Sequence, residues 1–142
     1  MQTFIRLYDT QPVVLAHLLC ALGALLLGIW MLNGRKGSTL HRWLGWLWVS
    51  LMAGATVTSV FILDRGMLNL GGYTPIHLLT VITAVGLFGG IRAIRRGEVK
   101  AHSKTMRSLF WGACVVAGAF TLLPNRFLGH WLWHDVLGWA AA

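Results

Sequence analysis

Four histidines stand at matching places in this chain and are its strongest candidates for chemistry. Each of four long apolar segments carries one of them near its N-terminal end: His17, His41, His77 and His102. A neutral imidazole nitrogen binds iron, copper or zinc, and the other ring nitrogen can donate a hydrogen bond that orients the ring. The repeated placement predicts that the four residues act together in binding a metal or a metal cofactor.

The segments that hold these histidines are long enough to cross a membrane. Hydrophobic residues make up 56% of the 142-residue chain and charged residues only 11%, whereas soluble domains have about 25% charged residues. Four stretches lack Asp, Glu, Lys and Arg, and a spanning helix needs roughly 17 to 25 residues: 10–34, 43–63, 66–91 and 108–125. The sequence predicts one all-α domain over 1–142, an antiparallel four-helix transmembrane bundle with helices near 12–33, 40–63, 75–95 and 101–123.

The net charge of +8 is concentrated in two of the connections between these segments. The first and third connections hold Arg35, Lys36, Arg42, Arg92, Arg95, Arg96, Lys100, Lys104 and Arg107, whereas the other side holds only Arg6, Arg65 and Arg126. Lys and Arg accumulate in cytoplasmic loops. We therefore expect both termini to be periplasmic in a bacterial inner membrane, and we expect no nucleic-acid binding, because the charges flank apolar segments.

Local signals indicate where the segments begin, end and pack. Ser38 or Thr39 is available as a helix cap, and Gly97-Glu98 marks a turn. The face that begins at His17 continues through a stripe of small residues, Cys20, Ala21, Ala24 and Gly28. Such a stripe either makes room for a bulky cofactor or allows close helix packing, and the sequence leaves both interpretations open.

The C-terminal tail is apolar but too short to span a membrane as a helix. It contains Trp131, Trp133 and Trp139, so we predict a short interfacial helix over 127–140. His130 and His134 are four residues apart and would share one helical face. We interpret the tail mainly as a membrane anchor and keep this histidine pair as a second candidate metal site.

Antiparallel helices place the four segment histidines at two depths. His17 and His77 would lie near the outer face, and His41 and His102 near the inner face, about 20 Å away at 1.5 Å per helical residue. Two pairs at two depths favour two bis-histidine haems, whose chemistry is electron transfer. No Cys-X-X-Cys-His motif occurs, so b-type haem is expected. Arg42 and Arg107 are candidate partners of the haem propionates.

This hypothesis has two rivals. The same histidines would hold copper or zinc, or relay protons, in a metal-binding or transport protein. Alternatively, the chain is a non-catalytic subunit of a larger membrane complex. An enzymatic role would be an oxidoreductase or electron carrier of the quinone-reductase or metal-reductase type. The candidate partners are the lipid bilayer, a redox protein or quinone, and a second copy of the chain in a homodimer.

Several short motifs carry a family resemblance. They are Gly-Gly-Ile-Arg-Ala from Gly89, His102-Ser-Lys-Thr-Met-Arg107, Pro124-Asn-Arg126, His41-Arg42 and Ser59-Val-Phe-Ile. The chain resembles the bacterial membrane family called domain of unknown function 2306, which implies four helices. Its histidine layout is also similar to that of cytochromes b561, in which alternate helices hold two b haems. That similarity implies that His17, His77, His41 and His102 are the ligands.

Overall fold

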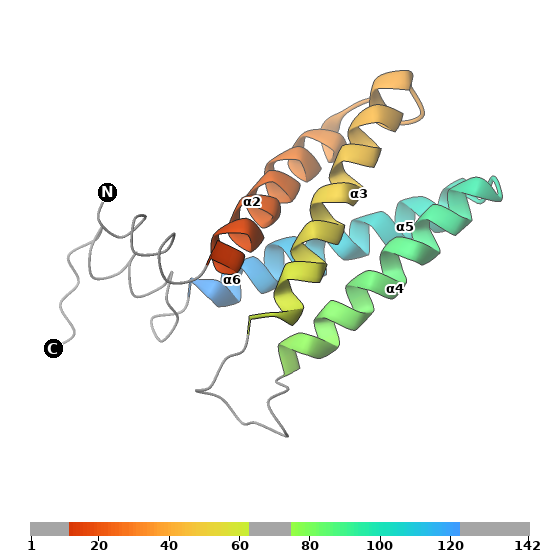
Figure 1. Cartoon of the computed structure of the whole chain (residues 1–142). Helices are drawn as coiled ribbons and strands as arrows, with labels where there is room; N and C mark the ends of the chain where they lie inside the picture. The colour runs from red at the N-terminus through yellow and green to blue at the C-terminus, as the bar shows by residue number, and fades with distance from the viewer. Residues whose placement is uncertain (1–11, 63–74, 123–142) are drawn as a thin grey trace, which may run out of the picture.

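The computed structural model describes residues 12–62 and 75–122, and within these two ranges all regular structure is helical (Figure 1). The helices are α2 (Pro12–Asn33), α3 (Thr39–Val60), α4 (Pro75–Arg95), α5 (Val99–Leu109), the π-helix η1 (Phe110–Val116) and α6 (Ala117–Thr121). The tail predicted over 127–140, with His130 and His134, lies outside the described residues.

A local hydrogen bond and a glycine turn shape the connection between α2 and α3. The Ser38 hydroxyl accepts a hydrogen bond from the backbone N–H of His41 at 3.1 Å, which satisfies a donor in the first turn of α3. Gly37 has a φ of +82°, a conformation that favours glycine. Of the two predicted caps, Ser38 and Thr39, Ser38 is the one that caps α3.

The connection between α4 and α5 is shorter, with residues 96–98 between the helices instead of residues 34–38. Gly97 has a φ of +77°, and the backbone N–H of Glu98 donates to the carbonyl oxygen of Ala93 at 2.9 Å. α5 then begins at Val99. The predicted turn at Gly97-Glu98 is confirmed.

Three helices are long and apolar enough to cross a membrane: α2, α3 and the part of α4 over Leu78–Arg95. The remaining apolar segment is built differently. The sequence predicts one α-helix over 101–123, but α5, η1 and α6 follow one another there, with π-helical turns over Phe110–Val116. The hydrophobic pattern of such a short stretch does not distinguish α from π turns, so this difference was not predictable from periodicity.

The helices form two hairpins that pack against each other near their middles. α2 packs along α3 and α4 along α5, while α3 contacts α4 and α2 contacts η1. In Figure 1 the two short connections lie toward the same end of the molecule, and the hairpins diverge there. We call this end, which holds all nine described Lys and Arg residues, the basic end. The buried core lies between the ends and consists of Ala24, Trp48, Met52, Leu87, Leu109 and Phe110.

In the C-terminal half of α2, the stripe of small residues serves helix packing. Ala24 is fully buried, and its carbonyl oxygen accepts a hydrogen bond from the indole Nε1–H of Trp48 at 2.9 Å. A Cβ at Gly28 would lie 2.5 Å from the Phe110 ring and 3.0 Å from the Trp48 indole nitrogen. The stripe therefore receives two aromatic side chains, and the space at Ala24 and Gly28 is filled by the protein itself.

Candidate histidine sites

His17 is held against α3 by its ring nitrogen Nδ1. This atom lies 2.9 Å from the carbonyl oxygen of Ala55 and 3.1 Å from Oγ1 of Thr58. A carbonyl oxygen only accepts, so Nδ1 carries the hydrogen. The Thr58 hydroxyl donates to the Gly54 carbonyl at 2.7 Å, so its oxygen is free to accept from the same Nδ1–H. In a neutral ring this tautomer leaves the lone pair on Nε2, the nitrogen that would bind a metal.

His102 is held in the same way by a different helix. Its Nδ1–H donates to the carbonyl oxygen of Gly90 on α4 at 2.9 Å. The lack of a side chain on Gly90 brings the helices together: a Cβ there would collide with the side-chain methyl of Met106. His102 is half-buried in the first turn of α5, and Nε2 again retains the lone pair.

His41 lies at the same end of the molecule as His102. It stands in the first turn of α3, is half-buried, and is within range of electrostatic interaction with His102 and with Lys36. The two histidines of the predicted inner level therefore lie at the same end of the molecule, on two hairpins that diverge there.

His77 is the third residue of α4, and its side chain lies outside the described part of the structure. Its backbone position can still be related to the other histidines. Ser59 and Thr80, one turn along α4 from His77, bring their hydroxyl oxygens to 3.0 Å. Ser59 follows Thr58, the partner of His17. His17 contacts α3 at Thr58, and α4 contacts α3 at Ser59, one turn from His77. Both histidines therefore lie at the end of the molecule opposite the basic end.

Two histidine levels follow from these contacts. On α3, His41 and the His17 partner Thr58 are 17 residues apart, which is about 25 Å along a helix. On α4, His77 and the His102 partner Gly90 are 13 residues apart, which is about 20 Å. We call the level of His17 the outer level and that of His41 and His102 the inner level. Within 12–62 and 75–122, three or more His, Cys, Asp or Glu side chains nowhere gather into a metal-binding group.

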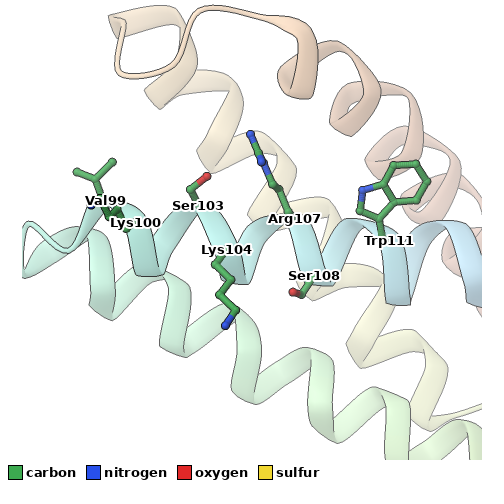
Figure 2. A pocket seen from close by; sticks show the side chains of 7 residues that line it. All are labelled: Val99, Lys100, Ser103, Lys104, Arg107, Ser108 and Trp111. Carbon is green, nitrogen blue, oxygen red and sulfur yellow. The ribbon is translucent and has the colours of Figure 1, made fainter.

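The two arginines singled out from the sequence lie at the basic end. Arg42 follows His41 in the first turn of α3, and Arg107 stands in the last turn of α5; both are exposed. Figure 2 shows the Arg107 side chain directed toward the α2–α3 hairpin. Both residues therefore belong to the basic end of the molecule, opposite the end that holds His17.

Sequence reasoning missed the acceptors that orient the histidines. The carbonyls of Ala55 and Gly90 belong to neighbouring helices, and a sequence pattern does not indicate which backbone oxygen faces a given ring. A partial signal existed for each. Thr58 was one of several small polar residues in the outer half of α3, and Gly90 belonged to a glycine cluster that permits close approach.

Comparison with known proteins assigns the chain to a family. No curated protein matches it, and no solved structure does. The family described as "predicted membrane protein (DUF2306)" matches residues 14–141, nearly the whole chain. The match extends over both histidine levels and agrees with the three apolar helices that could span a membrane. The chain therefore belongs to the DUF2306 family of membrane proteins.

Proposed function

We propose that this protein is a small dihaem cytochrome b that transfers electrons across the bacterial inner membrane. One observation carries the proposal. His17 and His102, at opposite levels, each donate Nδ1–H to a backbone carbonyl of a neighbouring helix and keep the Nε2 lone pair. Histidines that bind metals are characteristically held in this way, because the second hydrogen bond fixes the tautomer and orients the ring.

The ligand pairs would be His17 with His77 and His41 with His102. Each pair joins alternate segments, the layout of the cytochromes b561, in which the haems lie at two depths. The donor set fits haem iron in its chemistry, since neutral imidazole is a common axial ligand. Held by these histidine pairs, the haems would supply one-electron transfer.

The proposed topology is a four-helix transmembrane bundle. The fourth crossing would be the apolar part of the continuous helical stretch 99–121, which begins after Arg107 and follows the charged first half. The basic end would face the cytoplasm and both termini the periplasm.

The remaining residues would have distinct tasks. Arg42 and Arg107 would neutralise carboxylates at the inner level. Trp48 is seven residues from His41 and ten from Thr58, so it lies between the two levels on α3. Together with Phe110 and Leu109 it would exclude water from the space between them. A quinone or a redox protein at either face would exchange electrons with the chain.

Absorption spectroscopy of the full chain, purified from haem-replete cells, tests the proposal. We expect a dithionite-reduced spectrum of b type and two haems per chain. A colourless, folded protein that contains copper or zinc by elemental analysis would instead favour the metal-binding alternative. A colourless, metal-free protein that co-purifies with a stoichiometric partner would favour a structural subunit. Either of these results would overturn the cytochrome proposal.

A further inference from the structure

A shallow, open cationic groove runs along α5 and the start of η1, on the surface of the basic end (Figure 2). It has a volume of about 640 Å³ and is lined by Val99, Lys100, Ser103, Lys104, Arg107, Ser108 and Trp111. In Figure 2, Ser103, Arg107 and Trp111 leave the helix on the side of the α2–α3 hairpin, and Lys104 and Ser108 leave it on the other side. The groove thus lies between two rows of side chains.

The charges of this groove are not neutralised within the described chain. Lys100, Lys104 and Arg107 form no ion pair with any carboxylate in 12–62 and 75–122, where Glu98 is the single acidic residue. Three neighbouring cations that border one groove repel one another, so an anion bound among them would be stabilised. Ser103 and Ser108 add hydroxyl donors suited to phosphate oxygens.

The groove is cationic at one end and apolar at the other. Lys100, Lys104, Arg107 and Trp111 follow one another along the helix at spacings of four, three and four residues, with Lys104 on one side of the groove and Arg107 and Trp111 on the other. The cations occupy the end near the connection, and Trp111 occupies the end that leads into the apolar stretch of η1 and α6. Tryptophan is enriched where the headgroup region meets the hydrocarbon core. The arrangement matches an amphipathic ligand with an anionic head and an apolar body.

We propose that this groove binds the headgroup of an anionic phospholipid, with its phosphate among Lys100, Lys104 and Arg107. A lipid fits this groove better than a free anion, because the cations adjoin the exposed Trp111 and the apolar surface of the helix. The proposal needs no haem, but it shares Arg107 with the proposed inner haem site, so its test rests on Lys100 and Lys104. A lipid held there would stabilise α5 against α4, the helix that positions His102.

Native mass spectrometry of the detergent-solubilised full chain, titrated with phosphatidylglycerol, tests this proposal. We expect phosphatidylglycerol to be retained in preference to the zwitterionic phosphatidylcholine. The double variant K100Q/K104Q should weaken retention by up to about thirtyfold, because each basic residue near an anionic surface contributes about fivefold. Arg107 is left intact in this variant, so that the proposed inner haem site is undisturbed.

Two matched variants separate the groove from the general charge of the basic end. R35Q/K36Q removes the same number of exposed cations from the other connection and should change retention less than twofold. K100R/K104R keeps the charges and should retain the lipid. Equal losses in K100Q/K104Q and R35Q/K36Q would overturn the proposal, because they would show diffuse electrostatic attraction. Equal retention of phosphatidylcholine, or displacement of the lipid by millimolar inorganic phosphate, would also contradict it.

Discussion

The outer and inner histidine levels orient a ring by the same kind of hydrogen bond, but their electrostatic surroundings differ. His17 and His102 each donate Nδ1–H to a backbone carbonyl at 2.9 Å. Around His17 the described neighbours are neutral hydroxyl and carbonyl groups, whereas His102 shares its end of the molecule with all nine described cations. Ring orientation is therefore set by close helix packing at both levels, while the charge of the surroundings is set by topology. This difference predicts that the two proposed haems respond to different substitutions.

Removal of one histidine should have the largest effect and should be confined to its own level. We expect His102→Ala to abolish the inner haem and His17→Ala to abolish the outer one, because the remaining imidazole cannot hold the iron from both sides. Haem quantification and the reduced spectrum of each purified variant measure this. If either substitution removed both haems from a protein that is still folded, the levels would not be independent.

A packing defect between the levels should affect both of them. Gly28→Ala places a Cβ 2.5 Å from the Phe110 ring, and overpacking of this kind costs about 1 to 3 kcal/mol of stability. We expect a lower melting temperature in detergent and parallel weakening of both haem sites. Gly89→Ala is the matched control, since a Cβ at Gly89 would meet no atom within 4 Å. An unchanged melting temperature for Gly28→Ala would argue against the close contact of α2 with Phe110.

Loss of the threonine beside His17 should weaken the outer level alone. Thr58→Val removes one of the two acceptors of the His17 Nδ1–H and leaves the Ala55 carbonyl, so the expected cost is about 1 kcal/mol. Haem retention during dilution should fall at the outer site and stay constant at the inner site. Thr56→Val is the control, because the Thr56 hydroxyl donates to Met52 of its own helix. Equal effects of the two variants would show that Thr58 does not position His17.

The smallest expected effect concerns the redox potentials. Nearby cations disfavour the oxidised, more positive iron, so the inner haem should have the higher potential. Arg42→Gln should lower that potential by roughly 40 mV, the equivalent of about 1 kcal/mol for one electron, and leave the outer potential unchanged. A spectroscopic redox titration at low ionic strength measures both values. A larger shift at the outer haem would reverse the assignment of the levels.

The sequence indicated the parts of the fold that depend on local chemistry. Ser38 as a helix cap and Gly97-Glu98 as a turn were predictable because each rests on the backbone preferences of one or two residues. The membrane class followed from long stretches without charge. The π-helical turns at Phe110–Val116 were not predictable, because they depend on how one segment packs against others.

The sequence alone determined that four histidines recur at segment ends, that the basic residues gather at one end, and that apolar helices connect the two ends. These properties follow from residue type and spacing. The tertiary structure decided which atoms face one another. It placed His41 and His102 at one end of the molecule on different hairpins, directed the two Nδ1–H groups to Ala55 and Gly90, and filled the space at Gly28 with Phe110. Such contacts join residues far apart in the chain, and only the packing of complete helices selects them.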